Sequence, residues 1–221
     1  LRETTQENPG ADVEIIREDA GGSSDTAQEG AGQNGGGQPR VALTFDDGPN
    51  SAFTELLLNG LKERGVKATF FLLGQNLEGN EAIVRRMQEE GHLIGNHTYH
   101  HVRISRISEA EALEEIESTS NAIYQLTGVY TSFVRPPYGE WKKGLDFHVT
   151  MIPVLWTIDS RDWVTQDVGQ ILNAVLPSVE DGSIILMHDE FAESVEAALQ
   201  IVDTLLEEGY CFVTADDLLL E

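Results

Sequence analysis

The chain has 221 residues and a formal net charge of -24 at pH 7, because 38 acidic residues stand against only 14 lysines and arginines. This excess of negative charge disfavours nucleic acid and anionic membrane surfaces as partners, since both are bound through clustered Lys and Arg. No stretch approaches the roughly 20 apolar residues that cross a bilayer, so the sequence predicts a soluble chain without a transmembrane segment.

Residues 1–38 differ in composition from the rest of the chain. They contain no aromatic residue and are rich in Gly, Ser, Gln and acidic residues. Such a segment buries too little apolar surface to offset its ordering entropy, so we expect a flexible acidic tether there. Residues 39–221 are long enough for one domain with a core. An acidic linker and a first residue other than Met favour an extracellular or surface-tethered protein whose leader or anchor has been removed.

Short runs of apolar, β-branched and aromatic residues predict seven strands. In chain order they cover residues 40–45, 67–73, 92–96, 130–134, 151–158, 183–187 and 211–214. The single cysteine, Cys211, lies in the last of these runs and can form no internal disulfide, so we expect a buried, unreactive thiol.

Between the strands, apolar residues recur at three- and four-residue offsets, which predicts helices with one buried stripe. These segments cover residues 56–61, 83–87, 108–126, 168–176 and 195–206. Ser108 and Glu111 have the spacing of a capping box, in which serine and glutamate satisfy free amides at a helix start. The alternation of strand and helix indicates an α/β architecture with a largely parallel, helix-covered sheet.

Polar clusters directly follow five of the predicted strands. They are Asp46 with Asp47, His97 with His101, Arg135, Asp159 with Asp162, and His188. Residues that leave the carboxyl ends of barrel strands converge on one face, whereas an open sheet concentrates its chemistry at one crevice. The distribution therefore favours a barrel over a doubly wound sheet, with one reaction centre at the strand ends.

The histidines and the carboxylates together indicate a metal site. Two imidazoles and one carboxylate leave positions open for water or substrate, which is the pattern of a catalytic divalent site. His100 is the alternative ligand, at three-residue spacing from His97. Taken singly, each signal has a plainer interpretation, because Asp-Gly-Pro forms ordinary turns and Arg135 or His188 could serve as structural polar residues. Taken together, these residues favour a catalytic site over separate structural roles.

Five motifs occur in order along the chain. They are Thr44-Phe45-Asp46-Asp47-Gly48-Pro49, His97-Thr98-x-x-His101, Arg135-Pro136-Pro137-Tyr138-Gly139, Asp159-x-x-Asp162-Trp163 and Leu186-x-His188. Together they resemble the motifs of the polysaccharide deacetylases, the NodB-homology domain of carbohydrate esterase family four. The resemblance covers everything except the tether. Local departures are small: residues 140–143 follow the Arg motif and residues 190–191 follow the His motif, where both could reshape the groove.

The resemblance implies a distorted (β/α) barrel of seven or eight strands in a single catalytic domain. It also implies metal-dependent removal of an N-acetyl group from a sugar. By motif, Asp47, His97 and His101 would hold the metal. Zinc is the usual ion in such proteins, and cobalt or nickel can substitute for it.

The same resemblance assigns an acid and a base. Asp46 would be the general base, paired with Arg135, whose positive charge favours the ionised carboxylate. His188 would be the general acid, since its unperturbed pKa of about 6.5 suits proton transfer near neutral pH. Asp162 would orient His188 and stabilise the imidazolium.

Supporting roles follow from the remaining motif residues. The Tyr138 backbone amide would join the metal in holding the oxyanion. Trp163 and Leu186 would form the wall near the acetyl methyl group. The resemblance gives Asp159 no defined role.

The expected partner is an N-acetylated glycan polymer or oligomer, and the expected state is a monomer. Residues 156–163 and the tethered layout resemble bacterial cell-wall deacetylases, which favours N-acetylglucosamine of peptidoglycan, with chitin oligomers next. O-deacetylation of acetylated xylan is a further alternative, since ester cleavage is easier than amide cleavage. Two others are a catalytically silent glycan-binding module and a metal-independent amidase acting on cyclic ureides. The intact polar set disfavours both.

Overall fold

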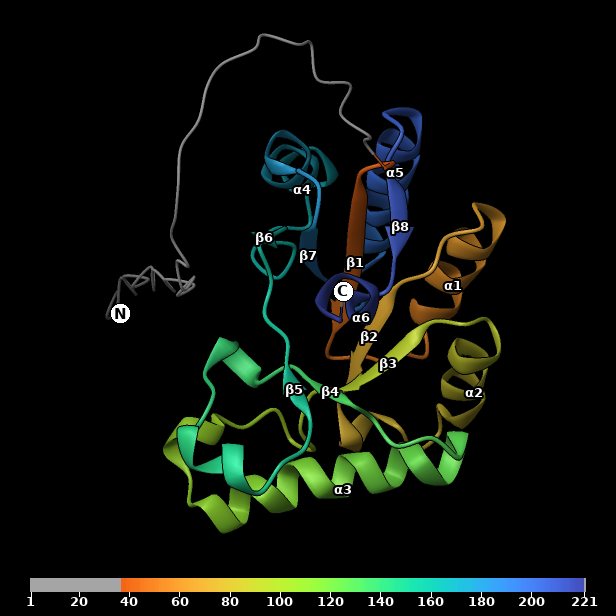
Figure 1. Ribbon diagram of the computed structural model, residues 1–221. Coiled ribbons are helices and arrows are strands. Elements are labelled where there is room, and N and C mark those ends of the chain that lie inside the picture. The colour runs from red at the N-terminus through yellow and green to blue at the C-terminus, as the bar shows by residue number, and fades with distance from the viewer. Residues whose placement is uncertain (1–36, 221) are drawn as a thin grey trace, which may run out of the picture. The chain divides into compact units, whose positions relative to one another are not determined.

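The structure, a computed structural model, describes residues 37–220, so the predicted tether over residues 1–38 lies outside the described residues except for its last two. Within that range, eight strands form one twisted sheet (Figure 1). They are β1 (Arg40–Asp46), β2 (Thr69–Leu72), β3 (Leu93–Asn96), β4 (Phe133–Val134), β5 (Ile152–Pro153), β6 (Ile158–Asp159), β7 (Ser183–His188) and β8 (Cys211–Val213).

The described part also contains six α-helices and five short 3₁₀ turns, all of which except the last helix lie between strands. The helices are α1 (Thr54–Glu63), α2 (Glu81–Glu89), α3 (Glu109–Thr127), α4 (Val168–Val175), α5 (Ala192–Glu207) and α6 (Ala215–Leu219). The 3₁₀ turns are η1 (Gly74–Asn76), η2 (Ile104–Arg106), η3 (Pro137–Gly139), η4 (Lys143–Phe147) and η5 (Leu176–Ser178). None of these helices is both long and apolar enough to cross a bilayer.

Strand β1 pairs with three other strands in the sheet, whose order is β5-β4-β3-β2-β1-β7-β6 with β8 also beside β1. One edge of β1 pairs with β7 over six residues, and the other edge is shared by β8 near its start and β2 near its end. Every strand pair is parallel, so the carboxyl ends of the strands lie at the same edge of the sheet. The predicted distorted (β/α) barrel of seven or eight strands is confirmed.

The prediction of a single strand over residues 151–158 is wrong, because this run forms two short strands. Strand β5 pairs with β4 and β6 pairs with β7, at opposite ends of the strand order. The carbonyls of Val154 and Leu155, between the two strands, accept hydrogen bonds from the Arg135 side chain. The apolar composition of this run predicts a buried strand. The Arg135 guanidinium, however, binds two carbonyls that a continuous strand would use to pair with its neighbours.

Helix α3 begins where the sequence predicts. The Ser108 hydroxyl accepts from the Glu111 amide at 3.2 Å, and the Glu111 carboxylate accepts from the Ser108 amide at 2.9 Å, which completes the capping box. The helix ends at Gly128, whose φ of 73° suits a residue without a side chain. In Figure 1, α3 lies below β4 and β5, and Asn96 at the end of β3 donates to the Ile116 carbonyl of this helix.

The core lies between β1 and the helices that cover it. Val41, Leu43 and Phe45 of β1 are at most 1% exposed and belong to one cluster with buried residues of α1, α2 and α5. The expected burial of Cys211 is wrong: its side chain is only half-buried. Strand β8 pairs with β1 alone, and Cys211 lines a surface depression beside Arg40 and Asp181.

Candidate active site

The five polar clusters meet at the carboxyl ends of the strands. Asp46 ends β1 and His188 ends β7, and these two residues are register partners across the β1–β7 pair. His97 directly follows β3, Arg135 directly follows β4, and Asp159 ends β6. The parallel sheet therefore brings together groups that are more than 140 residues apart in sequence.

Asp47, His97 and His101 form a group that could hold a metal ion. Their nearest ligand atoms lie within 4.8 Å of one another. Asp47 Oδ1 is 3.3 Å from His97 Nε2 and 3.4 Å from His101 Nε2. This oxygen is buried and makes no hydrogen bond, a state that costs free energy unless a cation or donor satisfies it. The donor set, two imidazole nitrogens and one carboxylate oxygen, fits a divalent ion.

A contact with a backbone carbonyl sets the tautomer of His97. Its Nδ1 lies 2.7 Å from the Arg135 carbonyl oxygen, and because a carbonyl only accepts, Nδ1 carries the proton. The lone pair is then on Nε2, which faces Asp47. The pKa of His101 is lowered by burial, partly opposed by Asp47, which favours the neutral imidazole that ligation requires.

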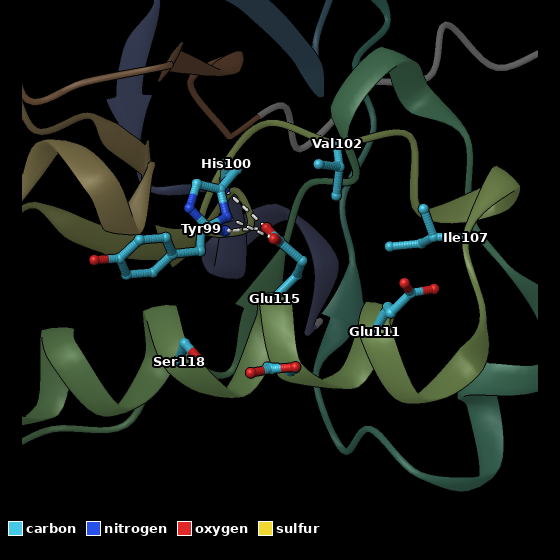
Figure 2. A pocket seen from close by; sticks show the side chains of 8 residues that line it. Tyr99, His100, Val102, Ile107, Glu111, Glu115 and Ser118 are labelled. Atoms are coloured by element: carbon cyan, nitrogen blue, oxygen red, sulfur yellow. Dashed lines mark hydrogen bonds and ion pairs between the residues drawn. The ribbon is translucent and has the colours of Figure 1, made fainter.

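His100, the alternative ligand, is not part of this group. It faces Glu115 of α3, whose Oε1 is 2.7 Å from His100 Nδ1 (Figure 2). The other oxygen, Oε2, accepts the backbone amides of Tyr99 and His100 at 2.9 and 2.8 Å. A cavity of roughly 390 Å³ lies here between the loop and α3. Glu115 thus anchors the segment between His97 and His101 to the helix.

Asp46 and Arg135 form a buried ion pair, with Asp46 Oδ1 2.8 Å from Arg135 Nη1. The Arg135 side chain is fully buried, and it also donates to Thr44 Oγ1 and to two backbone carbonyls. Its guanidinium carbon lies 4.2 Å from the centre of the Phe71 ring. Burial lowers the pKa of Arg135, and Asp46 opposes that shift. Multiple acceptors compensate the buried charge, so Asp46 faces a fixed cation.

His188 and Asp162 form a second pair. His188 Nδ1 is 2.8 Å from Asp162 Oδ1, and the His188 amide donates to Asp162 Oδ2 at 2.7 Å. The ring's other nitrogen, Nε2, is 3.9 Å from Asp47 Oδ2. Burial works against the charged imidazole, but the hydrogen bond and charge of Asp162, with Asp46 and Asp47, raise the pKa of His188 to about 9. His188 is therefore protonated at neutral pH.

Asp47 stays ionised in this cluster. Burial favours its neutral form, but the neighbouring His97, His101 and His188 outweigh burial and lower the pKa of Asp47.

Backbone strain concentrates at the same strand ends. In residues 37–220, five non-glycine residues have positive φ: Asp47 (70°), Thr98 (68°), His101 (57°), Tyr138 (62°) and Arg161 (59°). All of them lie in loops that carry the predicted motifs. Such conformations cost about 1–3 kcal/mol each and persist where the surroundings fix them, often at functional sites.

The structure also places the predicted supporting residues. The Tyr138 ring is half-exposed, and its centre is 4.9 Å from that of His101. Leu186 is buried, whereas Trp163 is 57% exposed. The Trp163 indole donates to Asp159 Oδ1 at 3.3 Å, and the same oxygen accepts the Arg161 amide at 2.8 Å. Asp159 therefore fixes the turn that presents Trp163.

The sequence assigned no role to three residues whose side chains make contacts at or beside the site: Thr44, Glu115 and Asp189. Asp189 is fully buried, accepts a hydrogen bond from Thr54 at the start of α1, and has its pKa raised to about 7 by burial. Its only sequence signal was its place next to His188. Glu115 gave no signal, because a glutamate in an acidic helix is ordinarily solvated.

Comparison with known proteins assigns the family. Residues 33–149 match the sequence profile described as polysaccharide deacetylase. The peptidoglycan-N-acetylglucosamine deacetylase PgdA of Listeria monocytogenes is 37% identical over 179 residues, which are 81% of this chain and 38% of that protein. The chain therefore spans well under half of that relative's length.

Solved structures give the same assignment. The structure of the peptidoglycan deacetylase PdaC from Bacillus subtilis is 38% identical with a TM-score of 0.80, over 82% of this chain and 90% of that one. A family 4 acetyl xylan esterase from Clostridium thermocellum, in complex with a cobalt ion, is 37% identical with a TM-score of 0.76, over 81% and 89% of the two chains. By profile, sequence identity and fold, this chain belongs to the polysaccharide deacetylase family.

Proposed function

We propose that this chain is a metal-dependent hydrolase that removes N-acetyl groups from N-acetylglucosamine residues of a polysaccharide, and that the polysaccharide is peptidoglycan. One observation carries the proposal. Asp47 is within 4 Å of both candidate histidine ligands and of His188, while the adjacent Asp46 is ion-paired to a buried arginine. A candidate metal group, a carboxylate base and an imidazolium acid thus surround one point, as amide hydrolysis requires.

The proposed ion is Zn²⁺, held by Asp47, His97 and His101. When bound, such an ion would lower the pKa of a coordinated water toward the neutral range and would polarise a carbonyl group. The unsatisfied Asp47 Oδ1 supports the assignment, as does the cobalt ion of the acetyl xylan esterase relative. Cobalt and nickel are the proposed substitutes, because imidazole and carboxylate ligands accept several divalent ions.

The acid and base roles follow from the contacts of each residue. Asp46 takes the proton of the attacking water, and the ion pair with Arg135 fixes the Asp46 carboxylate in place. His188 gives a proton from Nε2 to the leaving amine, because its Nδ1 is committed to Asp162. Without that proton the amine is a poor leaving group.

Three further residues bind and orient the substrate in this proposal. The Tyr138 amide donates to the carbonyl oxygen as negative charge develops there, a contribution typically worth a few kcal/mol of barrier. Trp163 and Leu186 enclose the acetyl methyl group. Tyr138 and Trp163 are both exposed enough to meet a glycan.

Peptidoglycan is preferred because the relatives named above include a peptidoglycan-N-acetylglucosamine deacetylase and a peptidoglycan deacetylase. That substrate places the protein outside the cytoplasm, secreted or tethered at the cell surface through residues 1–38, and we propose that it acts as a monomer. Chitin oligomers, which present the same N-acetylglucosamine, are the second candidate. Acetylated xylan is the third, favoured by the acetyl xylan esterase relative.

The test is acetate release from peptidoglycan fragments, chitin oligomers and acetylated xylan, followed by mass spectrometry. We expect exhaustive chelation to abolish release and added zinc to restore it. His101→Ala should lose metal and activity, whereas His148→Ala, a change at an exposed histidine, should retain both. Activity that survives complete metal removal would refute the metal assignment. Acetate release from acetylated xylan alone would refute the assignment of peptidoglycan as the substrate.

A further inference from the structure

Two loops that follow different strands are joined beside the candidate metal group. Arg103 and Ser105 belong to the loop after His101, and Glu140 directly follows the turn that contains Tyr138. Arg103 Nη1 is 2.5 Å from Glu140 Oε1, and the Ser105 hydroxyl donates to Glu140 Oε2 at 2.5 Å. Each oxygen of one carboxylate therefore accepts a donor from the opposite loop.

The same arginine packs on the Tyr138 ring. The Arg103 guanidinium carbon is 4.1 Å from the ring centre, a cation–π contact. The same ring also neighbours His101, at 4.9 Å between centres, and His101 in turn neighbours His97, at 5.1 Å. Successive contacts therefore link Arg103 through Tyr138 to the two candidate histidine ligands.

Tyr138 needs such support because its backbone is strained. Its φ of 62° and ψ of 11° are left-handed, and Gly139 follows with a φ of 69°. The turn has few hydrogen bonds of its own: the Gly139 amide donates to Pro136 at 3.0 Å and the Glu140 amide to Pro137 at 3.4 Å. Two prolines before Tyr138 supply no amide donors, so side-chain contacts must hold the turn.

A second contact and a small apolar cluster support the same junction. The Lys142 ammonium donates to the Ile107 carbonyl at 2.6 Å. Ile104 is buried in a cluster with Leu145, against which Trp141 packs. Residues 140–143, which depart from the family motif, therefore connect the Tyr138 turn to the histidine loop.

We propose that Arg103 and Glu140 are positioning residues that clip the Tyr138 turn to the His101 loop. The clip holds the Tyr138 peptide and ring in register with His101, so that the amide donor and the metal ligands keep one geometry during the reaction. The proposal rests on the deacetylase function proposed above. Neither residue touches the reacting atoms, and both act through Tyr138.

The test measures kcat, KM and zinc content of Arg103→Gln, Glu140→Gln and the double variant. We expect each single change to lower kcat by about tenfold, because misplacing a group in the reaction geometry by a fraction of an ångström has effects of this size. KM and zinc content should change little. The double variant should be no slower than the slower single variant, since either change opens the same clip. Arg103→Lys should recover part of the rate, because it keeps the charge beside Glu140 but not the planar face over Tyr138.

A second readout does not depend on activity. Hydrogen exchange of the Gly139 and Glu140 amides should accelerate in both single variants, since the turn loses its anchors. Arg64→Gln is the matched control, because it breaks a comparably short ion pair, 2.6 Å to Asp203, away from the site. It should alter neither kcat nor exchange at residues 139 and 140.

The outcomes separate the two proposals. Reduced kcat with faster exchange supports the clip. Unchanged kcat in variants of an active wild-type enzyme overturns the clip and leaves the deacetylase function standing. If the wild-type protein releases acetate from no substrate, the proposed function fails, and the exchange rates alone decide whether the clip holds the turn.

Discussion

Asp46 and Asp47 are neighbours in sequence, yet their carboxylates have different surroundings. Asp46 Oδ1 meets the buried Arg135, whereas Asp47 Oδ1 lies between two histidines. The positive φ of Asp47 accompanies this separation, because it turns the chain sharply at the end of β1. Two identical residues thus acquire different chemistry from their neighbours, and this difference can be tested directly.

Asp46→Asn should keep the metal and lose turnover. Asparagine can still accept from Arg135, but it cannot take a proton, so we expect kcat to fall about 10²- to 10⁴-fold. Zinc content by atomic absorption should equal that of the wild type. Arg135 loses its counter-ion, so folding must be checked by circular dichroism at the assay temperature. The comparison variant, Asp47→Asn, should lose zinc. A near-normal rate for Asp46→Asn would exclude Asp46 as the base.

At the level of elements, the packing of β2 against β3 supports the site. Phe71 of β2 presents its ring face to the Arg135 guanidinium at 4.2 Å. Gly95 of β3 leaves the space that the ring occupies, since a Cβ at residue 95 would lie 2.4 Å from Phe71 Cδ1. The β2–β3 pair thus holds the Phe71 ring against the Arg135 guanidinium, which is ion-paired with Asp46.

Gly95→Ala should therefore disturb both folding and catalysis. The added methyl group displaces the Phe71 ring toward Arg135, and overpacking of this kind costs about 1–3 kcal/mol of unfolding free energy. Urea unfolding and kcat measure the two effects. Gly169→Ala is the control, because that glycine lies in the first turn of α4, where the nearest atom to an added Cβ is 3.3 Å away on the side chain of Asp167. If Gly95→Ala behaves like the control, Phe71 does not support Arg135.

For the whole molecule, a buried histidine away from the site links stability to pH. His92 is 7% exposed, and its Nδ1 accepts the Ala68 amide at 3.1 Å. Burial, with the charge of Lys67, lowers the pKa of His92 to about 4. Between pH 6.5 and 4 the unfolded chain binds a proton that the folded chain excludes, so this contribution to stability is present above pH 6.5 and is lost as pH falls. Asp189, whose pKa is raised to about 7, has the opposite effect on stability over an overlapping pH range, because there the folded chain binds the extra proton.

His92→Gln should isolate the histidine contribution, because glutamine can accept the same amide but does not titrate. Between pH 7 and pH 5 we expect the free energy of unfolding of the wild type, relative to that of the variant, to fall by roughly 2 kcal/mol. Urea unfolding of both proteins in the presence of a chelator measures this shift. The contribution of Asp189 is common to both proteins and cancels. A difference that does not change with pH would show that folding leaves the pKa of His92 unchanged.

Local signals in the sequence determined the elements and the identity of the reacting groups. Strand composition, the capping box at Ser108 and the helical stripes are short-range features, so they predicted an α/β barrel and located the ends of its main strands. The order of the motifs identified Asp47, His97 and His101 as one group, and the structure brings their ligand atoms together.

Only the tertiary structure decided the contacts that join distant segments. Val154 and Leu155 belong to an apolar run that predicts a strand, yet their carbonyls bind a guanidinium from another strand end. Glu115 has no local signal and Asp189 has only its place next to His188, because their roles depend on partners that folding brings to them. The joining of Arg103 to Glu140, 37 residues apart, has the same origin. Sequence patterns record burial and local geometry, whereas a side chain's partner is set by the three-dimensional packing of the whole chain.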